Sequence, residues 1–237
     1  MKIFFDKQKS EELTKRIEAK FFEEYIPRGN ELHVSDLTTC LMKPVCRLIG
    51  LEREKTKASV GLMVFGIIAE NVIAWTYPAD VLQFKSSMNL LKDEDDIFGH
   101  IDIFEEKRFP LEVKGTRKRI FRTRDIPVNW VEQLVSYISM QGADRGWLVI
   151  LNIISCQLMA FRIEMTNPER LDWLITLTSR ADAVKKLAKE IIERGININL
   201  TILEIRPEDY SMCGWKSCPR RDECKRKAKE LKKKALD

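Results

Sequence analysis

The sequence predicts one α/β unit in which helices precede, flank and follow a single mixed sheet. Two observations carry this prediction. Three strand-like segments, separated by the charged stretches KDEDD and EEKR, form an antiparallel meander over residues 81–90, 97–104 and 109–114. A helical segment then leads to two further strand-like segments, residues 147–155 and 157–164, which extend the sheet.

The composition is that of a folded globular chain. Its 237 residues are 44% hydrophobic and 32% charged, which excludes disorder over the whole length and suffices for a buried core. No apolar run approaches the ~20 residues that a membrane-spanning helix needs. The N-terminal stretch MKIFFDKQKSEE becomes charged before a signal-peptide apolar region develops, so we expect a cytoplasmic protein with no membrane contact.

Three predicted helices precede the sheet. Residues 10–25 have apolar side chains near one face, and residues 63–75 are apolar with helical spacing and stop near Pro78. Between them, Ser35 is of the residue type that favours an N-cap. It is expected to open a short helix that carries Cys40.

The second half of the chain adds helices around the last strands. Pro127 stands at a helix start, and that helix runs to about residue 141. Residues 168–194 are predicted to form a long helix that Gly195 ends. A short strand at residues 201–205 and a basic terminal helix close the chain.

The net charge of +5 is unevenly distributed. Residues 213–237 contain ten basic and four acidic side chains, whereas the rest of the chain is close to neutral. A second basic cluster occupies eleven positions of that neutral part: Lys114, Arg117, Lys118, Arg119, Arg122 and Arg124. Clusters of this kind are typical of a polyanion-binding protein, although a solvated loop or helix face gives the same pattern.

The cysteines indicate a metal site more than a disulfide framework, because no secretion signal is seen. Cys156 closes an apolar run and is predicted to be a small buried side chain. Three others lie within twelve residues: Cys213, Cys218 and Cys224. Their spacing and basic surroundings predict a four-thiolate site for zinc or iron, completed by a cysteine from far upstream. Such a site would join the two ends of the chain in a small cap.

Two consecutive strand segments carry residues suited to metal-dependent chemistry. Asp102 lies at the end of one, and Glu112 and Lys114 share a face of the next. Two converging carboxylates can hold a hard divalent cation. A neighbouring lysine can orient a metal-bound water and stabilise negative charge on a phosphate. An isolated ExK pair is also typical of an ordinary surface ion pair.

The next helix strengthens the functional interpretation. Trp130, Gln133 and Tyr137 form one stripe on it. An amide and a phenol on such a stripe are better placed over a substrate groove than in a core. The alternative is a core tyrosine whose hydroxyl is hydrogen-bonded.

The order of a helix, an Asp strand, an ExK strand and a Gln-x-x-x-Tyr helix resembles the PD-(D/E)XK nuclease superfamily. That last helix is similar to the one in its RecB-like branch. One upstream cysteine with three C-terminal cysteines is similar to the iron–sulfur members of the branch. At this length, without a helicase part, the chain resembles the CRISPR-associated RecB-like exonucleases, the fourth Cas family, over residues 35–224.

The resemblance implies a fold and an activity. We expect a single nuclease domain over residues 1–237, with a restriction-endonuclease-like mixed sheet core at about residues 60–206. An iron–sulfur cap would form from about residues 33–50 and 207–237. The implied activity is exonucleolytic hydrolysis of phosphodiester bonds at single-stranded DNA ends with Mn²⁺ or Mg²⁺, in CRISPR spacer acquisition and antiviral defence. The implied partners are DNA and other CRISPR adaptation proteins.

Residue by residue, the resemblance implies that Asp102 and Glu112 bind the metal and that Lys114 acts on the water. Gln133 and Tyr137 would orient the substrate and the lysine. A 4Fe–4S or, less often, a 2Fe–2S cluster would be held by Cys40, Cys213, Cys218 and Cys224, with Cys46 as a competitor of Cys40. The residues expected to bind DNA phosphates are Arg117, Lys118, Arg119 and Arg122.

The chain departs from the family pattern at one metal ligand. The family usually carries a histidine in a G-x-x-H-E pattern, and here the segment reads Gly66-Ile67-Ile68-Ala69-Glu70. Glu70 or His100, two residues before Asp102, could compensate for the missing ligand. Two other interpretations stay open: a nuclease-fold adaptor that binds DNA without cutting it, and a zinc-closed nucleic-acid binder.

Overall fold

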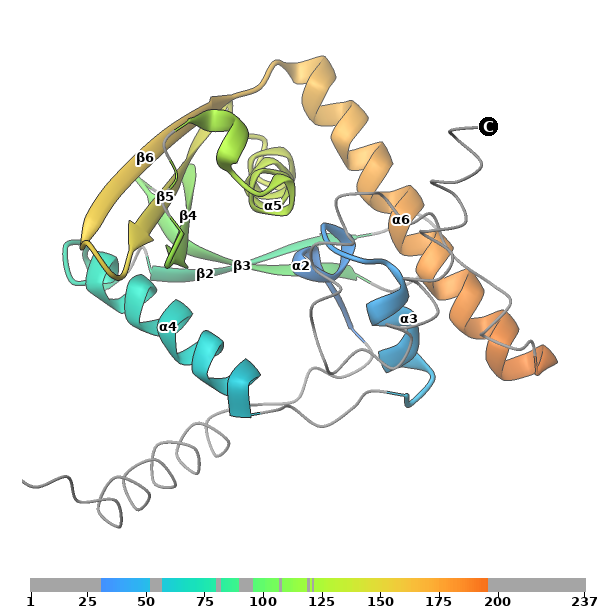
Figure 1. The fold of residues 1–237 in the computed structure, drawn as a ribbon. Helices are drawn as coiled ribbons and strands as arrows, with labels where there is room; N and C mark the ends of the chain where they lie inside the picture. Colours follow the sequence, from blue (N-terminus) through green and yellow to red (C-terminus); the bar gives the residue numbers. More distant parts are fainter. Residues whose placement is uncertain are drawn as a thin grey trace, which may run out of the picture.

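The structure, a computed structural model, is described for residues 31–51, 57–79, 82–89, 96–106, 108–118, 120 and 122–195 (Figure 1). The predicted helix at residues 10–25, the strand at 201–205 and the basic terminal helix lie outside these residues. Within the described residues, no helix is both long enough and apolar enough to cross a membrane.

A mixed sheet of six strands forms the centre of the fold (Figure 1). The strands are β1 (Leu32–His33), β2 (Leu82–Asn89), β3 (Asp96–Glu105), β4 (Phe109–Thr116), β5 (Arg145–Asn152) and β6 (Gln157–Glu164). β2, β3 and β4 pair antiparallel, which confirms the predicted meander. β4 and β5 are parallel, and β5 and β6 are antiparallel, so the predicted mixed α/β class is also confirmed. β1 adds in parallel to β3.

The helices have ends that their sequences explain. They are α2 (Val34–Leu37), α3 (Met42–Leu48), α4 (Lys57–Ala74), α5 (Val128–Met140) and α6 (Asn167–Arg194), with a 3-10 turn η2 (Thr123–Asp125). Pro127 is the N-cap of α5, as its position predicts. At the start of α6, Thr166 and Glu169 form a capping box, and Gly195 ends the helix at φ 60°.

The short helix α2 differs from the prediction at both ends. Its N-cap is His33, whose backbone N–H donates to Asp36 Oδ2 at 3.1 Å, so Ser35 does not cap it. Arg47 Nη2 in turn donates to the same oxygen at 2.8 Å and neutralises this buried carboxylate. Because α2 ends at Leu37, Cys40 lies between α2 and α3 and not on a helix.

Cys156 is exposed, so its predicted burial is wrong. β5 ends at Asn152, whose Oδ1 accepts the backbone N–H groups of Ile154 at 3.0 Å and Ser155 at 3.1 Å. This turn holds Cys156 at φ 54° between β5 and β6. The apolar run therefore contains a strand end and a tight turn, which asparagine favours and an apolar pattern does not reveal.

Three apolar clusters fill the layers between the sheet and its helices. The largest joins β1, α2 and α3 to β3 and α6, so the segment near Cys40 packs against the main core. A second lies between α5 and β5, and a third between α4 and the strands β4 and β5. α5 packs on Leu148 and Ile150 of β5, and α4 packs on the side of Val149 and Leu151, so the two helices cover opposite faces of the sheet (Figure 1).

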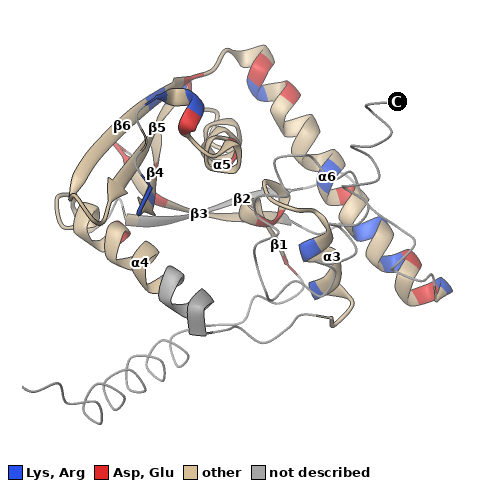
Figure 2. Cartoon of the chain, viewed as in Figure 1, with Lys and Arg blue, Asp and Glu red and all other residues tan. Residues whose placement is uncertain are grey.

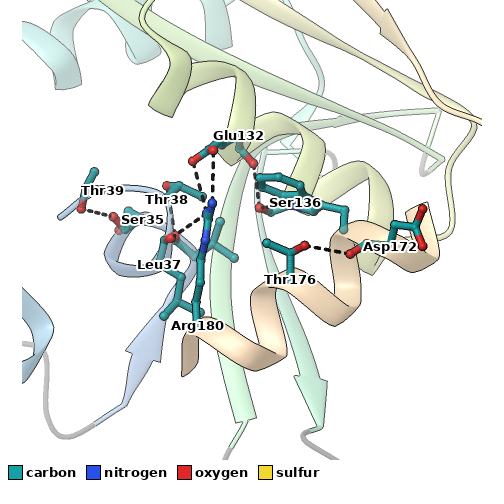
Figure 3. A network of polar contacts seen from close by, with 11 residues as sticks. Ser35, Leu37, Thr38, Thr39, Glu132, Ser136, Asp172, Thr176 and Arg180 are labelled. Carbon is teal, nitrogen blue, oxygen red and sulfur yellow. Dashed lines mark hydrogen bonds and ion pairs between the residues drawn. The ribbon is translucent and has the colours of Figure 1, made fainter. Parts of the chain in front are cut away.

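A buried polar network fixes α6 to α5 and α2 (Figure 3). Arg180 Nη1 donates to the carbonyl oxygen of Leu37 at 3.0 Å, and both its Nη atoms reach the Glu132 carboxylate at 3.3 Å. Nearby, Trp173 Nε1 donates to Ser136 Oγ at 2.9 Å. Because Glu132 is only 8% exposed, this ion pair is largely shielded from solvent.

Candidate functional site

The sheet divides near Asp102. The pairing of β3 with β4 ends at the pair Ile103 and Leu111, while β3 continues beside β2 and β4 continues beside β5. Just beyond that pair, the backbone N–H of Val113 donates to Asp102 Oδ2 at 2.7 Å. The carboxylate therefore ties the two strands together where they diverge.

Four ionisable side chains from three elements interact at this division of the sheet. They are Glu70 on α4, Asp102 on β3, and Glu112 and Lys114 on β4, and we refer to them as the carboxylate cluster. The Lys114 ammonium donates to Glu112 Oε1. The other oxygen, Glu112 Oε2, is buried and has no hydrogen-bond partner among the described residues, although Glu112 is only 1% exposed. A buried carboxylate oxygen left in this state is costly unless a ligand completes it.

Burial raises the pKa of all three carboxyl groups, and the Asp102 charge raises the pKa of the other two further. The pKa of Glu112 rises to about 8, first because of burial and then because of the Asp102 charge. The pKa of Glu70 rises to about 7 for the same two reasons. Burial also raises the pKa of Asp102, and it outweighs the opposing effects of Lys114 and the Val113 N–H.

The lysine of the cluster stays charged. Burial alone would lower the pKa of Lys114, but the carboxylates of Glu112, Asp102 and Glu70 together raise it. One ammonium cannot neutralise three carboxylates, so the cluster retains protons near neutral pH. A divalent cation would displace these protons and supply the missing positive charge.

The residues present fit a hard cation such as Mn²⁺ or Mg²⁺. All the candidate ligand atoms are carboxylate oxygens, which such ions prefer, and Glu112 Oε2 has an unused coordination position. No group of three or more His, Cys, Asp and Glu side chains within the described ranges already surrounds one ion position. The carboxylates would therefore have to converge as the ion binds.

Small residues explain why Glu70 reaches the cluster. Ala69 is fully buried, and a Cβ placed on Gly115 would lie 3.1 Å from the Ala69 Cβ and 3.2 Å from the Phe65 carbonyl oxygen. α4 therefore lies close against β4 beside Lys114, with only the Ala69 methyl group at the contact. Because Ala69 is buried against Gly115, position 69 supplies no ligand atom to the cluster.

The structure does not group His100 with the carboxylates. His100 is exposed, and its ring stacks on His33 with 6.0 Å between centroids. It contributes only the smallest of the effects that act on the pKa of Asp102. The expectation that His100 replaces the missing histidine therefore gains no support from the geometry.

Gln133 and Tyr137 are brought together, as their i, i+4 spacing predicts. Gln133 Nε2 donates to the Tyr137 hydroxyl oxygen at 3.2 Å, and the tyrosine is 2% exposed. Its ring lies against β3 at Gly99, where an added Cβ would be 2.5 Å from Tyr137 Cε1. Gly99 is a residue that the sequence reading missed, although a glycine inside a strand often marks such a close approach. The third member of the stripe, Trp130, packs on the apolar cluster under α5.

The basic run that follows Lys114 is solvent-exposed where it is described. Arg117, Lys118 and Arg122 are exposed, and Arg119 lies outside the described residues. By contrast, basic and acidic residues are mixed along α6 (Figure 2). The exposed positive charge is therefore continuous in sequence with the carboxylate cluster.

Of the two segments predicted to form the cap, the structure describes only the N-terminal one. Cys40 is partly buried, whereas Cys46 is 3% exposed and belongs to the buried face of α3. Cys213, Cys218 and Cys224 lie outside the described residues.

Taken together, the fold and the cluster define a mixed α/β domain with a buried acidic site at a divided sheet. No protein-family profile and no curated protein matches the chain. Among solved structures, the crystal structure of SSO0001 matches with a TM-score of 0.59 and 16% identity, over 90% of this chain and 96% of that one. The two proteins therefore share a fold.

Two exonucleases also match, at lower scores. An alkaline exonuclease from Laribacter hongkongensis, LHK-Exo, has a TM-score of 0.47 at 10% identity, over 75% of this chain and 97% of its own. A phage-related exonuclease from Haemophilus somnus has a TM-score of 0.46 at 11% identity, over 70% of this chain and 96% of its own. At such scores function has to be argued from the residues of the site.

Proposed function

We propose that this protein is a metal-dependent nuclease that hydrolyses phosphodiester bonds of DNA at the carboxylate cluster. The observation that carries the proposal is the buried Glu112 carboxylate, which has Lys114 on one oxygen and no described partner on the other. A structural ion pair would satisfy both oxygens, whereas a site for a cation leaves one open.

Each residue of the cluster would have its own role in such a reaction. A bound Mn²⁺ or Mg²⁺ would supply Lewis acidity and a water of lowered pKa. Asp102 and Glu112, with Glu70 from α4, would hold the ion. The neighbouring carboxylates raise the pKa of Lys114, and its ammonium would orient the nucleophilic water and stabilise charge on the phosphate.

The substrate preference is proposed from the exposed basic run. Arg117, Lys118 and Arg122 can contact phosphates without reading bases, which suits sequence-independent binding of single strands. Attack at DNA ends, and a role in CRISPR spacer acquisition with other adaptation proteins, stay predictions of the family resemblance.

Cleavage of end-labelled single-stranded DNA with and without Mn²⁺ tests the proposal. We expect metal-dependent cleavage by the wild type and a loss of at least ~100-fold in Lys114→Ala, a typical effect of removing one electrostatic catalytic group. Lys189→Ala is the matched control because it removes an exposed lysine of α6 that pairs with Glu193, and it should match the wild type. Inactivity of the wild type, or full activity of Lys114→Ala, would overturn the proposal.

One observation favours a second candidate, a DNA-binding adaptor without activity. Ala69, at the position of the usual histidine, is fully buried against β4 and can supply no ligand. In that case the wild type would bind single-stranded DNA in a salt-dependent manner and leave it intact with every divalent cation tried. The same assay therefore separates the two candidates.

We also propose that Cys40, with the three C-terminal cysteines, holds an iron–sulfur cluster. The partial exposure of Cys40 supports it as the upstream ligand over the buried Cys46. Iron and sulfide analysis of anaerobically purified protein is expected to show a loss in Cys40→Ser but not in Cys46→Ser. Stoichiometric zinc in a colourless protein would contradict this and favour the zinc-closed alternative.

A further inference from the structure

An exposed aromatic ring lies beside a basic side chain next to the carboxylate cluster. Phe65 is 40% exposed on a face of α4 that also exposes the aliphatic Ile67 and Ile68, and it supplies the aromatic ring of that face. The guanidinium carbon of Arg117 lies 5.9 Å from the centroid of this ring. That distance is within the range of a cation–π contact.

The position of this pair is fixed by the same close packing that places Glu70. The Phe65 carbonyl oxygen lies 3.2 Å from the Cβ position of Gly115, which directly follows Lys114 in β4. Along α4, Glu70 is five residues from Phe65, or about 7.5 Å at 1.5 Å per residue. The ring and the guanidinium are therefore attached to the two elements that carry the ligands and the lysine.

We propose that Phe65 and Arg117 form a stacking platform for one nucleobase of the single strand whose phosphate enters the carboxylate cluster. This inference rests on the proposed nuclease function and adds a substrate contact to it. The ring offers an apolar face to a base, and every base has a face that stacks on it irrespective of sequence. The guanidinium can stack on the same base or hold its phosphate, and Lys118 extends the positive charge.

Charge and chemistry favour a nucleic acid over an apolar partner at this place. A hydrophobic protein surface would have to desolvate the exposed Arg117 and Lys118, whereas a nucleotide offers a π-face and a phosphate together. Ile68, one turn further along α4, is 47% exposed and aliphatic. It provides a matched control because its removal takes away apolar surface and no ring.

Binding to a fluorescent single-stranded oligothymidine in the presence of a chelator tests the platform without cleavage. Phe65→Ala is expected to weaken binding by roughly 5- to 10-fold, which is the lower end of the measured range for one base–aromatic stack. Phe65→Trp should restore it and Ile68→Ala should leave it unchanged. Circular dichroism of each variant checks the fold.

An abasic position moved along the oligonucleotide makes the test specific. At one position, the missing base should weaken binding by the wild type as much as Phe65→Ala weakens binding to the intact strand. The same abasic strand should bind Phe65→Ala no more weakly than the intact strand does, because the two changes remove the same contact. Equal losses in Phe65→Ala and Ile68→Ala, or an abasic effect that is the same in both proteins, would overturn the platform. No binding by the wild type would instead overturn the proposed function.

Discussion

Binding of a divalent cation to the carboxylate cluster should release protons. At pH 7 a group with a pKa of about 7 is half protonated, and a group with a pKa of about 8 is roughly nine-tenths protonated. If the ion displaces both, about 1.4 protons leave per Mn²⁺ at pH 7, and only about 0.1 leave at pH 9. Affinity for the metal should therefore rise steeply between pH 6 and 8 and level off above.

Isothermal titration calorimetry of chelator-treated protein measures this release. Mn²⁺ is titrated in two buffers of the same pH but different ionisation enthalpy, and the difference in heat gives the protons released. Glu112→Gln removes the group that carries most of them, so about half a proton should remain at pH 7. Glu164→Gln, at an exposed surface pair, is the control and should match the wild type.

Two results would contradict the predicted proton release. One is a release close to zero at pH 7 with tight Mn²⁺ binding, since that would mean that the carboxyl groups are already ionised in the metal-free protein. The other is an unchanged release in Glu112→Gln, since the titrating groups would then lie elsewhere.

Three further predictions concern stability. Gly99→Ala should lower the free energy of unfolding by about 1–3 kcal/mol because the added Cβ meets Tyr137. Gly66→Ala should raise it by about 0.5–1 kcal/mol because the added Cβ has nothing within 4 Å. Chemical denaturation measures both. Arg180→Ala should cost about 3–5 kcal/mol by removing the ion pair with the buried Glu132 and the hydrogen bond to Leu37. Arg162→Ala, at an exposed pair, should cost less than ~1 kcal/mol. The metal-free protein binds more protons than its unfolded chain between pH 4.5 and 8, so its melting temperature should fall across that window. A loss of stability in Gly66→Ala as large as that in Gly99→Ala, or in Arg162→Ala as large as that in Arg180→Ala, would contradict the first two predictions. A melting temperature that rises with pH would contradict the third.

Local sequence patterns predict most of the fold. The strands around Asp102 and Glu112 alternate clearly and are joined by a short charged turn, so their antiparallel pairing follows from sequence separation alone. The start of α5 at Pro127 and the end of α6 at Gly195 follow from backbone restrictions of single residues. These features depend on neighbours in the chain and are therefore readable from it.

The parts that could not be predicted depend on contacts between distant segments. The N-terminus of α2 is held by Asp36 because Arg47 from α3 neutralises it, which no local pattern at Ser35 reveals. The approach of Glu70 depends on Ala69 and Gly115 being small at the same point.

The candidate site, too, could be predicted from the sequence only in part. Glu112 and Lys114 share a strand, so their pairing follows from alternation. The open position at Glu112 Oε2 and the raised pKa values arise from burial by several elements at once, and only the folded chain shows them.

The most direct test of the nuclease assignment is the rate of Mn²⁺-dependent cleavage of end-labelled single-stranded DNA by Asp102→Asn. The asparagine oxygen can still accept the Val113 N–H, so the strands should stay joined while the charge proposed to hold the ion is lost. We predict a rate at least ~100-fold below that of the wild type, with an unchanged circular dichroism spectrum. A folded Asp102→Asn protein that cleaves at the wild-type rate would contradict the assignment of this cluster as the catalytic site.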